Sequence, residues 1–343
     1  MALRQIKFWL VASVAASQIA WAYDRKEGGN FASRALACEH IEREAHNPLR
    51  FEDAVHCLAP LVDQAKYDTT KAELSYRRAE LLERDERFAE ARALFLSLAH
   101  NYPREMIAAR ARFRAARLLE DALGDAPAAL AEYKLLIREA PDNVAAVNAL
   151  SHAEQLIPAG EVTYFLSTEL EARPRSALAL SLMQRLATRL EKNPDSARVA
   201  AELFDRLSEA QREPARITST YLAARAWLAA GDVAAAMARL RIVMGSLVSS
   251  ILPGDTNSAS LDDAAFLFAE IYRDRLHDPL HAREAFERVL HDYPTSRLVD
   301  DALYALEALA IEQGDPALAR KWYARLQHDR PSSRYARAAY APR

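Results

Sequence analysis

The sequence predicts an all-α protein built as an α-solenoid of about eight antiparallel helical hairpins. One pattern, an alanine followed four residues later by an aromatic residue and eight residues after that by a proline, recurs in register. Only 8 of the 343 residues are glycine, which disfavours a glycine-punctuated β-barrel. No uncharged apolar stretch approaches the ~18 residues of a membrane span. The four copies of the pattern are Ala91-Phe95-Pro103, Ala129-Tyr133-Pro141, Ala282-Phe286-Pro294 and Ala319-Tyr323-Pro331.

Residues 1–22 have the organisation of a signal peptide. Arg4 and Lys7 precede an apolar segment at 8–16, and the A-x-A motif at 20–22 predicts cleavage before Tyr23. An uncleaved amphipathic first helix is the alternative. We expect a secreted, periplasmic protein, and no cysteine stands at the cleavage point for lipidation.

The first hairpin carries both cysteines of the chain. Apolar periodicity predicts helices at 31–45 and 51–65, hinged around residues 46–48. Cys38 and Cys57 lie nine to ten residues on either side of that hinge and therefore meet at the same height. In an oxidising compartment they are expected to form a disulfide that braces the hairpin, the alternative being two buried thiols.

The periodic segments that follow form further hairpins. Each copy of the pattern is preceded by another helical segment, at 73–83, 107–122, 262–275 and 300–313. In the connections a glycine ends one helix, an aspartate caps the next and a proline occupies its first turn. Residues 217–230 and 233–249 predict another such hairpin. The region 143–214 reads as two divergent hairpins.

We therefore predict an N-terminal block of about six hairpins at 31–250. A linker at 251–260 and a C-terminal block of two hairpins at 261–333 follow. The last residues, 334–343, form a basic tail. From Arg320 to Arg343 the chain has seven basic residues and one acidic residue. This tail suits contact with anionic lipid or an acidic partner, and a solvated end is the alternative.

The spacing of small, aromatic and proline positions resembles the tetratricopeptide repeat (TPR), a helical hairpin of 34 residues. With the signal peptide, the sequence is similar to bacterial cell-envelope members of that superfamily. Those include the Tol-Pal-associated coordinator of division and the helical lipoprotein of the outer-membrane barrel assembly machine. The resemblance implies a right-handed superhelix whose concave face is lined by the first helix of each hairpin.

Five aromatic residues lie 19 or 20 positions before the large residue of a second helix. In the related family this offset commonly faces the groove, so we expect an aromatic strip that contacts a peptide partner. The alternative is that the rings pack between helices. The five residues are Tyr76, Phe113, Tyr221, Phe266 and Tyr304.

No catalytic or cofactor-binding motif emerges from the sequence, and we expect neither an enzyme nor a cofactor or metal site. His277 and His281 straddle a predicted helix boundary and are interpreted as solvated. The carboxylate pairs at 262–263 and 300–301 are interpreted as charges favourable to a helix N-terminus. A net charge of −3 does not indicate a nucleic-acid partner.

The predicted function is a non-catalytic envelope scaffold that binds a protein or peptide. The alternative is an envelope enzyme or wall-glycan-binding subunit with a dispersed site.

The exported protein is expected to begin at Tyr23, because cleavage after the A-x-A motif removes the basic and apolar segments. Intact-mass measurement of the exported chain checks this. A retained Met1 or a lipid adduct would contradict the export pathway predicted here.

Overall fold

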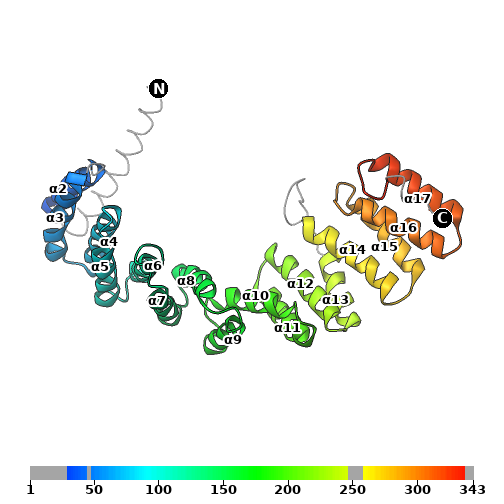
Figure 1. The fold of residues 1–343 in the computed structure, drawn as a ribbon, viewed down its shortest axis with the longest axis horizontal. Helices are drawn as coiled ribbons and strands as arrows, with labels where there is room; N and C mark the ends of the chain where they lie inside the picture. Colours follow the sequence, from blue (N-terminus) through cyan, green and yellow to red (C-terminus); the bar gives the residue numbers. More distant parts are fainter. Residues whose placement is uncertain (1–28, 45–47, 246–257, 337–343) are drawn as a thin grey trace, which may run out of the picture. The chain divides into compact units, whose positions relative to one another are not determined.

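The computed structural model describes residues 29–44, 48–245 and 258–336 (Figure 1). Within these residues there are sixteen α-helices, one short 3-10 helix and no strand. The α-helices pack in adjacent pairs, which confirms the predicted all-α solenoid of eight hairpins. In chain order they are α2 (Gly29–Glu44), α3 (Pro48–Gln64), α4 (Asp68–Arg84), α5 (Phe88–Asn101), α6 (Met106–Asp121), α7 (Ala126–Glu139), α8 (Val144–Leu156), α9 (Val162–Ala172), α10 (Ala179–Leu190), η1 (Pro194–Ser196), α11 (Ala197–Ala210), α12 (Ala215–Ala229), α13 (Val233–Gly245), α14 (Ser258–Asp274), α15 (Pro279–Asp292), α16 (Val299–Glu312) and α17 (Pro316–Asp329).

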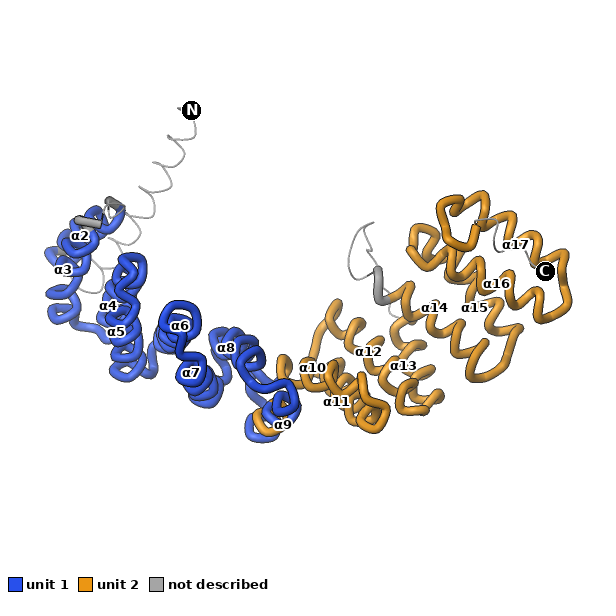
Figure 2. The backbone as a smooth tube through the Cα atoms, viewed as in Figure 1, with its two compact units in different colours: residues 1–165, 171–179 blue, residues 166–170, 180–343 orange. Residues whose placement is uncertain are grey.

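The chain divides into two compact units (Figure 2). Unit 1 comprises residues 1–165 and 171–179, and unit 2 comprises residues 166–170 and 180–343. The division falls near α9 and α10. The linker expected at 251–260 stays a prediction. Residues 251–257 lie outside the described residues, and residues 258–260 already belong to α14. Because α13 packs on α14, the last two hairpins continue the stack of unit 2.

Two other predicted segments lie wholly or partly outside the described residues. They are the signal peptide at 1–22 and residues 337–343 of the basic tail. Among the helices that the structure describes, none combines the length and apolar composition needed to cross a bilayer.

The turn inside several hairpins places one residue in the left-handed region of backbone space. Gly124, Gly231 and Gly314 occupy this position with φ of 69°, 82° and 73°. Glycine adopts this conformation readily because it has no Cβ. Glu86 and His277 take the same position in the hairpins α4–α5 and α14–α15, with φ of 59° and 49°. The turn geometry is thus shared by five hairpins, although glycine marks only three of them.

The residue after this position caps the second helix. The side chains of Asp125, Asp278 and Asp315 each accept a hydrogen bond from the backbone N–H three residues later, at 2.9–3.1 Å. A proline lies in the first turn of each of these helices. Capping aspartates satisfy backbone donors that have no intrahelical partner. These contacts confirm the predicted aspartate caps.

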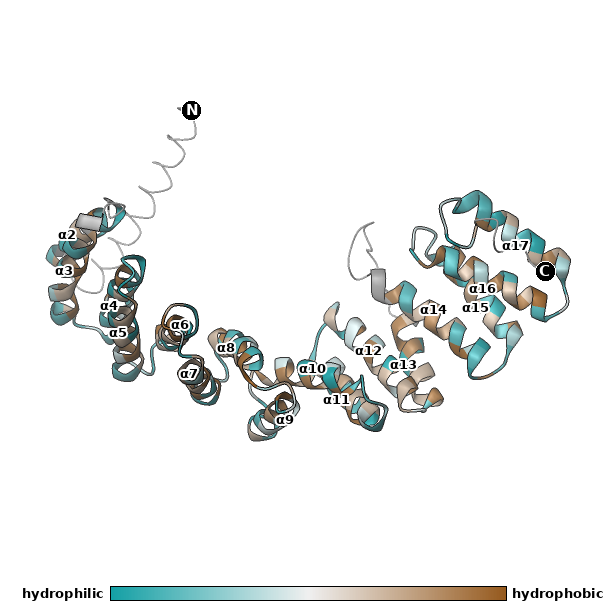
Figure 3. Cartoon of the chain, in the orientation of Figure 1, coloured by the Kyte–Doolittle hydropathy of each residue, from teal (hydrophilic) through white to brown (hydrophobic). Residues whose placement is uncertain are grey.

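The repeated alanine and large positions form the interior of the hairpins. Phe95, Tyr133 and Phe286 are completely buried, and Leu240 takes the equivalent place in α13. The alanines four residues earlier are also buried and allow the paired helices to approach closely. Figure 3 shows apolar and polar residues on different sides of most helices. In α17 the pattern shifts by one residue, because Trp322 is buried while Tyr323 is only partly so.

In unit 2, the segment that follows each of the last two hairpins is tied to the first helix of that hairpin. A serine and the arginine that follows it contact two consecutive aspartates 33 or 34 residues earlier. The pairs are Ser296 with Asp262, Arg297 with Asp263, Ser333 with Asp300, and Arg334 with Asp301. Asp300 and Asp301 lie in the first turn of α16, as the sequence interpretation expected, whereas that interpretation is corrected for Asp262 and Asp263. Since α14 begins at Ser258, Asp262 lies past its first turn, and its main role is a buried tertiary contact.

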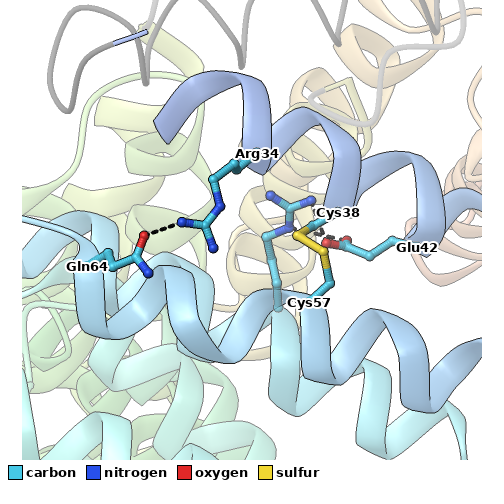
Figure 4. The surroundings of a disulfide bond; sticks show 6 residues. Arg34, Cys38, Glu42, Cys57 and Gln64 are labelled. Carbon is cyan, nitrogen blue, oxygen red and sulfur yellow. Dashed lines mark hydrogen bonds and ion pairs between the residues drawn. A yellow bond between two sulfur atoms is a disulfide. The ribbon is translucent and has the colours of Figure 1, made fainter. Parts of the chain in front are cut away.

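Cys38 and Cys57 form a disulfide between α2 and α3, as predicted (Figure 4). Their Cα atoms are 5.5 Å apart, which suits a disulfide. A hydrogen bond from Arg34 to Gln64 joins the same two helices. Glu42 of α2 forms a 2.8 Å ion pair with Arg77 of α4. Burial raises the pKa of the Glu42 carboxyl, and Arg77 opposes that shift. The first hairpin is thus held covalently within itself and by an ion pair to its neighbour.

Reduction of the disulfide is expected to loosen the first hairpin selectively. The chain-entropy model assigns roughly 3 kcal/mol to closing a loop of this length. Amide hydrogen exchange measured by mass spectrometry should therefore accelerate in α2 and α3 on reduction and stay unchanged in α16 and α17. A Cys38→Ser, Cys57→Ser double variant should show the faster exchange without reductant. Equal protection of α2 and α3 in the oxidised, reduced and double-variant proteins would contradict a bracing role.

Candidate binding surface

The first helices of consecutive hairpins lie next to each other in both units. In unit 1, α4 packs on α6 and α6 packs on α8, and in unit 2, α12 packs on α14. Residues in the middle of successive first helices therefore lie on one side of each unit. We call the surface formed by these helices the first-helix face of that unit.

Tyr76, the first of the five predicted contact residues, is buried. Its side chain is 3% exposed, and its ring lies 5.2 Å from that of Phe95, centroid to centroid. The guanidinium of Arg110, from the next first helix, lies 4.8 Å from the centroid of the Tyr76 ring. The structure therefore places Tyr76 in the core of its hairpin, beneath Arg110, because its ring fills the gap beside Phe95.

The other four predicted residues are half-buried. Phe113 packs on Tyr133 at 5.9 Å, and Phe266 packs on Phe286 at 5.3 Å. In each pair the first-helix ring contacts the large residue of its own second helix. This contact gives a physical cause for the constant offset in the sequence. Part of each of these rings nevertheless stays accessible to solvent.

Tyr304 and Tyr221 have different neighbours. Tyr304 stacks on Tyr335, which follows α17, with ring centroids 4.3 Å apart and planes at 9°. The guanidinium of Arg225, one turn further along α12, lies 6.0 Å from the centroid of the Tyr221 ring. Burial, with a smaller effect of the Asp263 carboxylate, raises the pKa of Tyr221 to about 12. The Tyr221 hydroxyl is therefore neutral throughout the physiological pH range.

Unit 1 contains a polar and aromatic cluster that the sequence analysis did not identify. The buried Tyr133 hydroxyl donates a hydrogen bond to Glu120 at 2.6 Å, and Nδ1 of His152 lies 2.9 Å from the same carboxylate oxygen. The His152 ring stacks on Tyr133 at 5.3 Å and meets the edge of Phe113 at 5.6 Å. Burial, followed by the hydrogen bond to Glu120, raises the pKa of Tyr133. The cluster joins α6, α7 and α8. His152 lies in the region read as divergent, where no repeat pattern marks it.

Unit 2 contains an open cleft of about 450 Å³ on its first-helix face. It lies at the C-terminal ends of α10 and α12 and extends over α14. Glu191 and Arg225 form an ion pair across it at 3.0 Å, so that Arg225 contacts both the cleft and Tyr221. The cleft combines cations with aliphatic side chains, which suits a ligand that is partly apolar and partly anionic. The residues that line it include Glu191, Lys192, Arg225, Leu228, Leu267 and Arg275.

No protein-family model and no curated protein matches the sequence. Among solved structures, the chain is similar to a structure of Naa15/Naa10 bound to HypK-THB, with a TM-score of 0.39 and 16% identity over 94% of this chain and 48% of that one. A human IFIT1 dimer with m7Gppp-AAAA gives a TM-score of 0.37 and 13% identity, covering 90% of this chain and 80% of that one. The crystal structure of BtubC from P. vanneervenii gives a TM-score of 0.33 and 16% identity, covering 68% of this chain and 95% of that one. This chain spans about half the length of the first of these structures. The class of the protein, an α-solenoid of helical hairpins, rests on the sixteen helices of the described residues, which pack in adjacent pairs.

Truncating the predicted contact residues should separate core rings from surface rings. Tyr76→Ala is expected to lower the free energy of unfolding by ~3–5 kcal/mol, because it opens a cavity beside Phe95. Tyr221→Ala should cost about 1–2 kcal/mol, since its ring loses less buried area. Chemical denaturation followed by circular dichroism measures both, with Tyr164→Ala as an exposed tyrosine control. If Tyr221→Ala lowers the free energy of unfolding as much as Tyr76→Ala does, Tyr221 is a core residue and does not belong to the proposed surface.

Proposed function

We propose that this protein is a non-catalytic scaffold of the bacterial cell envelope that binds a protein or peptide partner on its first-helix face. One observation carries the proposal. Half-buried aromatic rings, Tyr221 and Phe266 in unit 2 and Phe113 in unit 1, are packed on one side and accessible on the other. Aromatic residues are enriched among interface residues that contribute most to binding.

The packing of these rings lowers the cost of using them in an interface. Phe266 is held against Phe286, and Tyr221 lies beside Arg225, so each ring loses little rotational freedom when a partner covers it. Neighbouring first helices bring such rings together at the spacing of the repeat. An extended or helical peptide is the ligand that such a surface accommodates.

The compartment belongs to the same proposal. The sequence pattern at residues 1–22 supports export, and the Cys38–Cys57 disulfide is of a kind that persists in oxidising compartments. The resemblance of the repeat motifs to envelope members of the TPR superfamily supports the periplasm. The alternative is an envelope enzyme or wall-glycan-binding subunit with a site dispersed over the solenoid.

Site-specific photocrosslinking in the native cells tests the proposal. A photoreactive phenylalanine analogue replaces Tyr221 or Phe266, and Val199 on α11, which is 49% exposed, serves as the control position. We expect discrete protein adducts at Tyr221 and Phe266 and none at Val199. Fractionation of the same cells should recover the adducts in the periplasm.

Two outcomes would overturn the proposal. One is the absence of protein adducts at the first-helix positions together with retention or turnover of purified wall glycan. The other is recovery of the chain and its adducts in the cytoplasm with Met1 intact.

A further inference from the structure

We propose that the cleft between α10, α12 and α14 binds an acidic, leucine-bearing segment of the partner protein. This inference rests on the proposed function and specifies the chemistry of the ligand. The cleft is formed by three consecutive first helices of unit 2. At about 450 Å³ it has room for a few side chains of an extended peptide.

The apolar part of the cleft suits an aliphatic side chain of the ligand. Leu228 of α12 and Leu267 of α14 line it and are only partly buried by the rest of the chain. Ala229, the last residue of α12, is a small apolar residue of the same lining. A leucine side chain of a partner would remove these aliphatic carbons from water, which favours binding.

The charged part of the cleft suits a ligand that carries carboxylates. The Glu191 carboxylate already forms an ion pair with Arg225. Lys192 and Arg275 are exposed, and among the described residues neither has a carboxylate within ion-pair distance. Asp274, next to Arg275 in the sequence, forms a 2.6 Å ion pair with Arg273. Arg273 is the main cause of the lowered pKa of the Asp274 carboxyl, and the charge of Arg275 makes a smaller contribution. Lys192 and Arg275 therefore add positive charge beside the aliphatic residues of the cleft, and a ligand with acidic residues flanking a leucine complements that charge.

The surroundings favour a short acidic peptide over a nucleic acid. Asp263 and Glu270 on α14 balance the charges of Arg225 and Arg297 beside Tyr221, so the cations of the cleft do not continue into a longer basic surface that would suit a phosphate backbone. The whole chain has a net charge of −3. A peptide with a few carboxylates contacts only the cleft, and its leucine uses the aliphatic wall that a nucleic-acid backbone leaves empty.

Arg225 fixes the geometry of the cleft. Its guanidinium is held by the Glu191 carboxylate at 3.0 Å and lies beside the Tyr221 ring. A side chain ordered before binding loses little entropy when the ligand arrives. The cleft is therefore continuous with the aromatic surface of the proposed function.

Fluorescence anisotropy with the full mature chain tests the inference. The probe is a short fluorescein-labelled peptide in which leucines alternate with pairs of acidic residues, capped at both ends to remove terminal charges. Three comparison probes replace the acidic residues by lysine, replace the leucines by serine, or substitute a single-stranded oligouridine. We expect the acidic leucine peptide to bind with the lowest Kd and to weaken as salt is added.

The variants assign binding to the cleft. Lys192→Glu with Arg275→Glu should raise the Kd of the acidic peptide at least ~10-fold, and Leu267→Ala should raise it by roughly 5-fold. Arg206→Glu, an exposed charge reversal on α11, is the matched control and should leave the Kd within about 2-fold. Circular dichroism melting checks that all variants keep the wild-type fold.

Several results would overturn the inference. One is that the acidic peptide does not bind, and another is that the lysine or serine probe binds with the same Kd. A lower Kd for oligouridine than for the acidic peptide is a third. The fourth is that Arg206→Glu raises the Kd as much as the double charge reversal in the cleft does. Each of these leaves photocrosslinking at Tyr221 unaffected, so the inference can fail while the proposed function stands. Absence of both peptide binding and protein adducts would remove both.

Discussion

The structure depends on the contact between a first helix and the large residue in the middle of its second helix. A hairpin of two helices exposes apolar residues that it cannot bury alone, so it is stable only against a neighbour. Alanines such as Ala91 and Ala129 bring the helices close, and Phe95 or Tyr133 fills the remaining space. The same contact recurs along both units, and it sets the spacing at which every other side chain of the first helices is presented.

The candidate surface follows from that packing. A ring such as Phe266 has one side against Phe286, and its other side is the part available to a partner. Tyr76 shows the limit of this arrangement, because Arg110 covers its ring and the side chain becomes core. Where the first-helix face carries charge, most of it is paired within the unit, as Glu191 is with Arg225 and Asp263 with Arg297. The cleft proposed for the ligand lies beside Lys192 and Arg275.

The first and last described hairpins each contain contacts that hold their parts together. At the start of the described chain, the Cys38–Cys57 disulfide closes the first hairpin covalently. At the other end, Ser333 hydrogen-bonds Asp300, and Tyr335 stacks on Tyr304. These contacts tie the last described residues back to α16. Part of the predicted basic tail is thereby used internally, since Arg334 pairs with Asp301.

The local order of the fold could be predicted from the sequence, because its determinants are short-range. Periodicity, aspartate caps and the equal distances of Cys38 and Cys57 from one hinge suffice for the helices, the hairpins and the disulfide. The exposed sides of the rings could not be predicted, since the covering of Tyr76 by Arg110 depends on a residue in the next hairpin. The Glu120, Tyr133 and His152 cluster and the Lys192 and Arg275 cleft likewise join helices from different hairpins. Their members have no fixed spacing in the sequence, and only tertiary packing, which sets distances between hairpins, brings them together.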